Sequence, residues 1–231
     1  MKGYLQKAMS DTRLQAILTE CLPSAILKRN GQILYSGTDT LRPGRFYFLG
    51  FNPAADGTNP LLHNLPPNRK NWSAYTRQCW YDERCDARCP KVGKRPHQRR
   101  VQGIMSELGL HPEETFATNL IFVESRNVNE LKAAPLFHTY LEACWEVHKR
   151  MLSVVNPRYI VCLGNGEKDS SFSFVREKAE SMENEARELN FKSFDGIFHL
   201  NDGLSLPAKV IGVRHPSRPM SARGLRRFIG C

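Results

Sequence analysis

Short apolar runs alternate along this chain with longer segments whose apolar residues recur at helical spacing. The nearly continuous runs extend from Arg45 to Asn52, Thr115 to Val123, Tyr159 to Leu163 and Ala208 to Val213. The helix-length segments extend from Arg99 to Leu110, Leu136 to Val155 and Phe172 to Leu189. This alternation is typical of a mainly parallel sheet with helices on both faces. We therefore expect an α/β fold, namely a three-layer α/β/α sandwich with a central sheet of about four strands.

The segment before this core predicts a helix and a hairpin. Apolar residues between positions 3 and 21 have a rough helical spacing, which favours an N-terminal helix. Asn30-Gly31 separates two short apolar runs, 25–27 and 32–35, and this dipeptide favours a two-residue hairpin turn. The chain then reads as one domain over 1–231, with 1–44 as a helix-and-hairpin extension and 45–231 as the core.

The composition favours a globular protein that binds polyanions. The 231 residues include 33 Lys and Arg against 23 Asp and Glu, a formal net charge of +10, and a basic surface attracts nucleic-acid phosphates. No apolar run reaches the roughly 18 to 20 residues of a membrane helix, and the first residues lack the apolar stretch of a signal peptide. We expect a cytoplasmic monomer, nucleoid-associated if bacterial, that does not bind membranes. Seven cysteines are expected to be reduced thiols.

Polar side chains follow the apolar runs. In a parallel sheet, the functional residues gather at these carboxyl ends of the strands. The first run ends in Gly50-Phe51-Asn52-Pro53, the second contains Asn119, the third leads into Gly164-Asn165-Gly166, and the last leads into His215-Pro216-Ser217. An amide matches the hydrogen-bonding edge of a nucleobase. A histidine can donate to an oxygen that gains negative charge. A pocket that holds Asn52, Asn119 and His215 is therefore expected.

Two of these segments resemble the motifs of the uracil-DNA glycosylase superfamily. Gly50-Phe51-Asn52-Pro53 is similar to the Gly-x-Asn-Pro first motif of its mismatch-specific and single-strand-selective branches, and Val213-Arg-His-Pro-Ser217 to its His-Pro-Ser second motif. The resemblance spans residues 45–228. It implies a uracil-DNA glycosylase-like domain that flips a damaged or mismatched, uracil-like base out of duplex or single-stranded DNA in base-excision repair. The N-glycosidic bond is then hydrolysed without metal or other cofactor.

The resemblance also implies roles for the individual residues. Asn52 orients the attacking water and His215 stabilises the leaving oxygen, so both are the catalytic candidates. Asn119 recognises the base edge, and Gly50, Phe51 and Pro53 complete the base-binding segment. The residues expected to contact DNA lie in and after the second motif: Ser217, Arg218, Arg223, Arg226 and Arg227.

The long segment between Pro53 and Pro96 exceeds an ordinary loop and is expected to be functional or partly helical. It mixes aromatic and basic residues, a combination that either binds nucleic acid or packs as core or lid. His63 and Tyr75 are candidates for stacking on an extruded base. Another basic run follows, formed by Lys91, Lys94, Arg95, Arg99 and Arg100.

Other interpretations remain open from the sequence. Asn52-Pro53 suits a turn, Asn119 suits a sheet edge, His215 suits a helix cap, and Asp56 could act as a base or tighten a turn. Cys79, Cys85 and Cys89 with His97 are spaced unlike common zinc sites, so a metal-dependent enzyme is the weaker hypothesis and no metal ligand is assigned. A non-catalytic protein that binds nucleic acid or a nucleobase on the same fold is the main alternative.

Overall fold

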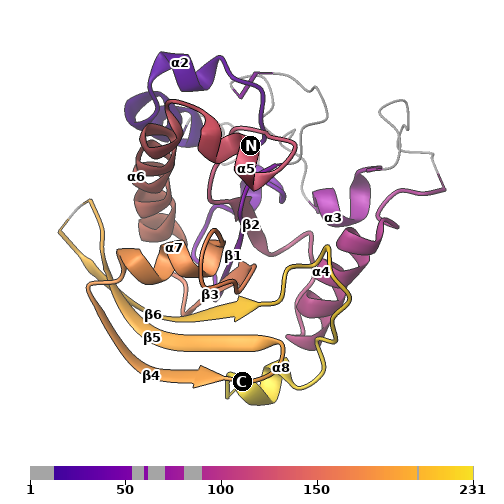
Figure 1. The fold of residues 1–231 in the computed structure, drawn as a ribbon. Coiled ribbons are helices and arrows are strands. Elements are labelled where there is room, and N and C mark those ends of the chain that lie inside the picture. Colours follow the sequence, from indigo (N-terminus) through magenta and orange to yellow (C-terminus); the bar gives the residue numbers. More distant parts are fainter. Residues whose placement is uncertain (1–12, 54–59, 62–70, 81–89, 202, 231) are drawn as a thin grey trace, which may run out of the picture.

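The computed structural model describes residues 13–53, 60–61, 71–80, 90–201 and 203–230. A six-stranded sheet in the order β2-β1-β3-β6-β5-β4 forms its centre (Figure 1). The strands are β1 (Phe46–Gly50), β2 (Phe116–Asn119), β3 (Tyr159–Leu163), β4 (Ser181–Arg187), β5 (Phe191–His199) and β6 (Ser205–Val213). Neighbours in the β2-β1-β3-β6 part are parallel, and β5 and β4 add to β6 as antiparallel strands. The expected α/β class with a mostly parallel sheet is confirmed.

The expected number of about four strands is wrong, because the segment after α7 (Ser171–Lys178) forms a hairpin. The sequence predicts one helix from Phe172 to Leu189, but the helix ends at Lys178 and β4 follows. Residues 181–187 are polar and would form an ordinary helix surface. Pairing with β5, whose Phe194 and Phe198 are buried, outweighs that local preference.

The longer helices agree with the sequence prediction within a few residues. These are α4 (Pro96–Glu107) and α6 (Phe137–Val155). Residues 13–21 are helical, as expected for the part of the N-terminal helix that is described. The shorter elements are α2 (Ser24–Leu27), a 3-10 helix (Thr38–Thr40), α3 (Ala74–Arg77), α5 (Val128–Ala133) and α8 (Leu225–Phe228). Because α3 lies in the long segment after Pro53, that segment is partly helical, as expected.

Each face of the sheet has its own apolar core. Tyr47 and Leu49 on β1 point into a cluster that includes α6 and α7, whereas Phe46 and Phe48 point into a second cluster with α4 and α8. Figure 1 shows these helix pairs on opposite faces. Helices thus cover both faces, which is why the parallel strands read as continuous apolar runs.

The hairpin expected around Asn30-Gly31 is wrong. Residues 24–27 form α2, and the next residues pair with distant segments, with Gly31 bridging to Val123 and Leu34 to Thr118. A Cβ on Gly31 would lie 2.0 Å from the Phe122 carbonyl oxygen. The glycine therefore permits a close backbone approach rather than a turn.

No helix among the described residues is long and apolar enough to span a membrane.

Candidate active site at the carboxyl edge of the sheet

The carboxyl ends of the parallel strands meet at one edge of the sheet. Gly50 at the end of β1 pairs with Asn119 at the end of β2, and Leu163 at the end of β3 pairs with Val213 at the end of β6. With neighbouring strands about 4.8 Å apart, the ends of β1 and β6 are separated by about 10 Å, since only β3 lies between them. The segments that carry Asn52, Asn119 and His215 therefore leave the sheet at the same edge.

Asn119 and Gly50 are in direct contact. Asn119 is 5% exposed, and its amide makes no hydrogen bond to the described residues. A Cβ on Gly50 would lie 1.9 Å from the Asn119 Oδ1. Glycine at position 50 is thus required for the observed position of the Asn119 side chain, which supplies a buried amide with unused hydrogen-bonding capacity.

Asn52 is half-buried and its amide orientation is fixed. The Nδ2 group donates to the carbonyl oxygen of Pro53 at 2.7 Å and to the Oγ of Ser125 at 2.9 Å. Both amide hydrogens are used in this way, so Oδ1 is the atom left to accept a hydrogen bond. No described residue donates to it. Asn52 can therefore hold a water through its carbonyl oxygen.

The segment beside Asn52 is packed against the chain that follows β2. The backbone N–H of Ile121 donates to the Phe51 carbonyl at 2.9 Å, and that of Ser125 donates to the Pro53 carbonyl at 3.2 Å. Phe51 is half-buried against the α6 core and Pro53 is buried. The sequence did not point to Ser125, because it lies 73 residues from Asn52 and belongs to no motif.

Local hydrogen bonds determine the tautomer of His215. The backbone N–H of Ser217 donates to Nδ1 at 3.2 Å, and the Ser217 hydroxyl lies 2.7 Å from the same nitrogen. Nδ1 is therefore an acceptor, and the proton of the neutral ring is on Nε2. Burial, together with the nearby Arg218 guanidinium, lowers the pKa of His215. The result is a neutral imidazole that can donate from Nε2.

Aromatic rings connect His215 to the core. The His97 ring is nearly perpendicular to the His215 ring, with the ring centroids 5.4 Å apart. The centroids of the Trp80 and His97 rings are 5.5 Å apart. Burial, followed by unfavourable electrostatic interactions with His215, Arg100 and Arg95, lowers the pKa of His97 to about 4. The sequence suggested His97 only as a metal ligand; its contact with His215 depends on the fold.

Tyr75 belongs to the same group of rings and is 2% exposed. The prediction that it stacks on an extruded base is therefore wrong, because Trp80 and the core cover it. His63 and Asp56 lie outside the described residues.

A basic groove of about 620 Å³ lies beside the second motif, lined by Lys91, Lys94, Pro96, Arg99 and Arg100. Arg100 joins the groove to the motif, because its guanidinium donates to the Pro216 carbonyl at 2.7 Å. The charged run that leads into α4 therefore reaches the same edge as His215 through Arg100.

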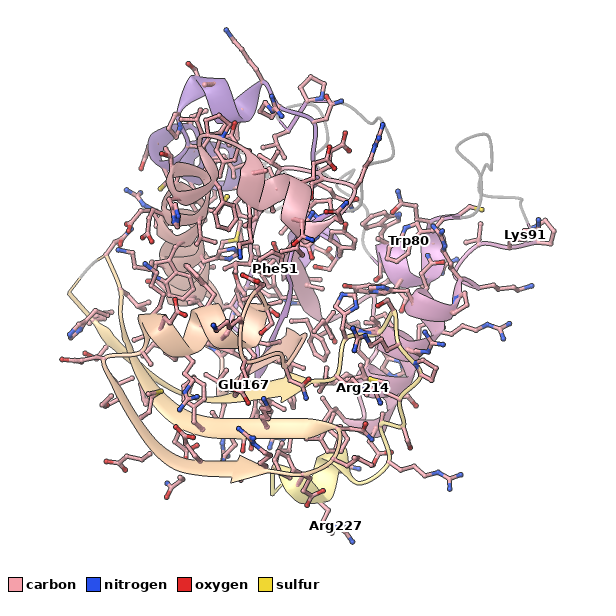
Figure 2. All side chains as sticks on the ribbon, viewed as in Figure 1. Phe51, Trp80, Lys91, Glu167, Arg214 and Arg227 are labelled. Carbon is pink, nitrogen blue, oxygen red and sulfur yellow. The ribbon has the colours of Figure 1, made fainter. Side chains whose placement is uncertain are left out.

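The arginines near the C-terminus are divided between two places. Ser217 and Arg218 are exposed beside His215. Arg223, Arg226 and Arg227 lie around α8, where the Gly224 N–H donates to Glu107 at the end of α4. His97 and Glu107 are ten residues apart, so about 15 Å of helix separates this cluster from the His97 end. In Figure 2, Arg227 is well separated from Arg214.

The cysteines do not assemble a metal centre among the described residues. Cys79 is disulfide-bonded, so the expectation of reduced thiols is wrong at this position, and a disulfide sulfur is no thiolate ligand. Cys85 and Cys89 lie outside the described residues. In the described part of the chain, no group of three or more His, Cys, Asp or Glu side chains could hold a metal ion.

A buried histidine supports the strand ends from α6. His148 Nε2 lies 3.0 Å from the Leu120 carbonyl oxygen, and its Nδ1 lies 2.7 Å from the Tyr47 hydroxyl. A neutral ring satisfies both contacts if Nε2 donates and Nδ1 accepts. Burial lowers the pKa of His148 to about 4. This contact fixes the carbonyl group of Leu120, the residue that follows Asn119.

Comparison with known proteins assigns the chain to no class: no protein-family description and no curated protein matches it.

Proposed function

We propose that this protein is a DNA base-excision glycosylase with a uracil-DNA glycosylase-like, three-layer fold. The observation that carries the proposal is His215, a neutral imidazole with its proton on Nε2, at the same sheet edge as two constrained amides. Hydrolysis replaces the bond between the sugar C1′ and the base nitrogen by a bond to a water oxygen. The base leaves with the electron pair, and the proton of the water ends on the released base or in solvent.

The three side chains suit three different tasks in this reaction. His215 Nε2–H donates to the base oxygen that becomes negative, where a preorganised donor is most effective. The Oδ1 of Asn52 accepts from the attacking water, because both hydrogens of its own amide are already bound. The unused amide of Asn119 hydrogen-bonds the edge of the extruded base.

The groove beside Arg100 gives DNA a path to this edge. Phosphates bound by Lys94, Arg99 and neighbouring cations would release counterions, so affinity should fall steeply as salt rises. Arg100, which lines the groove, donates to the Pro216 carbonyl, so the groove is better placed for DNA than the cluster around α8. Arg99→Glu should therefore weaken binding more than Arg226→Glu, the matched control.

The test is a panel of duplex and single-stranded oligonucleotides that carry uracil, a thymine mismatch, hypoxanthine or other damage. Wild type should produce alkali-labile abasic sites from at least one of them, and the Asn52→Ala/His215→Ala double variant should not. Asn119→Asp should change which base is accepted, since a carboxylate cannot donate as an amide does.

Binding without any abasic product would contradict the proposal. The protein would then be a non-catalytic binder of nucleic acid or nucleobases.

A further inference from the structure

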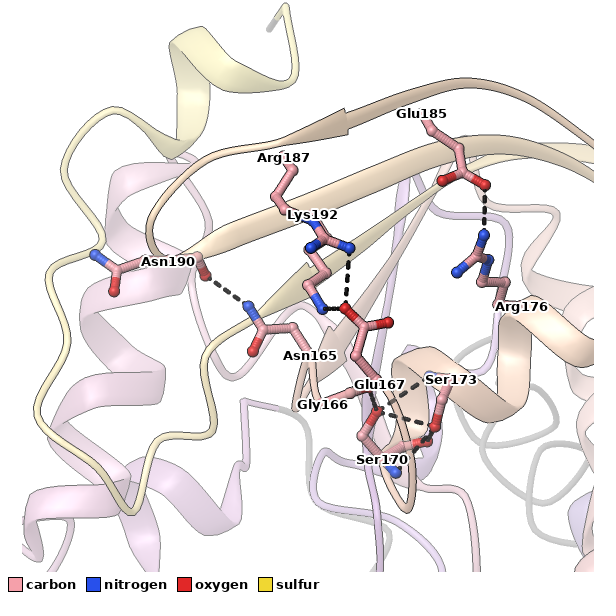
Figure 3. Close-up of polar contacts among 10 residues, drawn as sticks. All are labelled: Asn165, Gly166, Glu167, Ser170, Ser173, Arg176, Glu185, Arg187, Asn190 and Lys192. Carbon is pink, nitrogen blue, oxygen red and sulfur yellow. Dashed lines mark hydrogen bonds and ion pairs between the residues drawn. The ribbon is translucent and has the colours of Figure 1, made fainter.

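The backbone that leads to His215 is fixed from the side of β5. The Arg214 N–H donates to the Asn190 carbonyl oxygen at 2.9 Å, and the Nδ2 of Asn165 donates to the same oxygen at 3.1 Å. Figure 3 shows the contact between Asn165 and Asn190. One carbonyl thus joins the segment before His215 to the loop after β3. These contacts fix the backbone, and the orientation of the imidazole ring depends on other neighbours.

Local hydrogen bonds alone hold the orientation of the His215 imidazole weakly. The contacts between its Nδ1 and Ser217 lie at the surface, where Ser217 is exposed. A hydrogen bond that is open to water contributes little net free energy, and the torsion about the Cβ–Cγ bond of histidine has broad minima. A Cβ on Gly164 would lie 3.8 Å from the His215 Cδ2, so this edge of the ring faces the end of β3.

The ring of His97 packs against the ring of His215. The ring planes meet at 82° with their centroids 5.4 Å apart, which is the edge-to-face arrangement that aromatic rings prefer. Burial lowers the pKa of His97 to about 4, so at neutral pH this ring adds no positive charge beside His215. The contact therefore acts through shape.

His97 is itself held firmly at the start of α4. The neighbouring Gln98 is completely buried, and its Nε2 donates to the carbonyl oxygens of Ala74 and Gln78, both at 2.8 Å. These bonds fix the backbone of the first turn without help from the His97 side chain. The Trp80 ring packs against the His97 ring and limits its freedom to turn.

The same face of α4 also contacts the backbone of the second motif. Residues three apart lie on one side of a helix, and Arg100 donates to the Pro216 carbonyl at 2.7 Å. The helix therefore contacts the motif at two successive residues, through the ring of His215 and the carbonyl of Pro216.

We propose, on the basis of the proposed function, that His97 is a positioning residue for His215. Its ring limits rotation of the His215 imidazole, so that the Nε2–H keeps the direction in which it donates to the oxygen of the departing base. A donor that is already oriented needs no reorganisation when the charge develops. His97 takes no part in the bond cleavage itself.

Three variants separate this positioning role from other roles. His97→Ala removes the ring, while Gln98 still fixes the backbone. His97→Phe keeps an aromatic ring that has no nitrogen to bind or release a proton. His111→Ala is the matched control, because His111 is exposed and follows the other end of α4. Urea unfolding establishes that each variant is folded.

Nitrogen NMR of the protein labelled at its histidines observes the His215 ring without any substrate. The shifts of Nδ1 and Nε2 in a neutral ring show which nitrogen has the proton. At neutral pH, wild type, His97→Phe and His111→Ala should show the proton on Nε2. His97→Ala should show shifts averaged between the two tautomers, because a ring that turns freely loses its contacts with Ser217 part of the time.

Single-turnover excision from the oligonucleotide that wild type cleaves measures the effect on the reaction. His97→Ala should be slower by about 10-fold, since a small misplacement of a catalytic group lowers the rate strongly. Its affinity for DNA should not change. His97→Phe and His111→Ala should stay within about threefold of the wild-type rate, because the ring that limits rotation is retained in both.

The outcomes separate the positioning role from the proposed function. Wild-type shifts or a wild-type rate in His97→Ala overturn the positioning role and leave the glycosylase. A loss in His97→Phe as large as in His97→Ala also overturns it, because a nitrogen of His97 would then be the group that matters. Averaged tautomers in His97→Ala, together with a wild type that excises no base, support the positioning of the His215 ring and overturn the glycosylase.

Discussion

The parallel part of the sheet and the β4–β5 hairpin differ in how they are held. Every residue of β1, β2 and β3 is buried, and every residue of β4 is exposed. Apolar contacts on both faces fix the parallel strands, whereas the outer hairpin strand is held by its ladder to β5 and by surface ion pairs such as Arg176–Glu185. The comparison teaches that side chains needing fixed positions come from the parallel part, and that the outer strand of the hairpin is fixed mainly by its pairing with β5.

The largest effect is expected at His215, in the segment after the last parallel strand. His215→Ala should slow single-turnover base excision by about 10² to 10³-fold, because it removes one preorganised donor where charge develops. DNA affinity should hardly change. Rapid-quench kinetics measure the rate, and a rate within threefold of wild type would show that His215 takes no part in the chemistry.

A large effect of pH on the free energy of unfolding is expected from His148, which lies beneath the parallel strands. Its pKa is about 4 in the folded protein, against about 6.5 in an unfolded chain. As pH falls from 6.5 to 4, only the unfolded state gains a proton, so the free energy of unfolding falls by about 3 kcal/mol from this residue. His97, with the same shift, adds a similar amount.

Urea unfolding at pH 7.5 and pH 4.5 tests this loss. His148→Gln should remove about half of the difference between the two pH values. A difference in His148→Gln as large as in wild type would show that burial of His148 has no part in acid sensitivity.

A smaller effect is expected from the contact between β1 and β2. Gly50→Ala should lower the free energy of unfolding by about 1 to 3 kcal/mol and impair excision, since the new Cβ displaces the Asn119 amide. Gly44→Ala is the control, because its Cβ would lie 3.6 Å from the nearest atom. If both variants unfold at the same urea concentration, the close contact between Gly50 and Asn119 does not contribute to stability.

The smallest effect is expected in the hairpin. The hydrogen bond and charge of Lys192, with the charge of Arg187, lower the pKa of the exposed Glu167. Exposed pairs contribute little to stability, so Glu167→Gln should shift Tm at pH 7 by about 1 °C or less. A lowered carboxyl pKa stabilises only above the unfolded pKa, so the shift should vanish in acid. A loss of stability as large as that caused by Gly50→Ala would remove the contrast between the two regions.

The sequence predicted the parallel part well because its apolar runs are continuous. The run from Tyr159 to Leu163 is β3 without change, and the segment expected from Leu136 is α6. The hairpin was missed because β4 has no apolar alternation and takes its strand form from β5. Asn30-Gly31 misled because the glycine packs on Phe122, a contact that local sequence does not encode.

The same reasoning applies to the candidate site. Strand ends predicted that Asn52, Asn119 and His215 leave one edge of the sheet, because parallel strands end together. Ser125, which orients Asn52, and His97, which packs on His215, depend on contacts between distant segments. The groove at Arg100 was visible as a charged run, but its attachment to Pro216 was not.

Leu120, the residue after Asn119, is held from two sides. The Leu120 N–H donates to the Gly50 carbonyl at 2.9 Å, and the Leu120 carbonyl contacts His148. The residue is thereby attached to both β1 and α6. The amide proton of Leu120 should therefore exchange with deuterium only when the whole protein unfolds, while the amides of β4 exchange through local opening. The slowest-exchanging part of the molecule would then lie directly under the candidate active site.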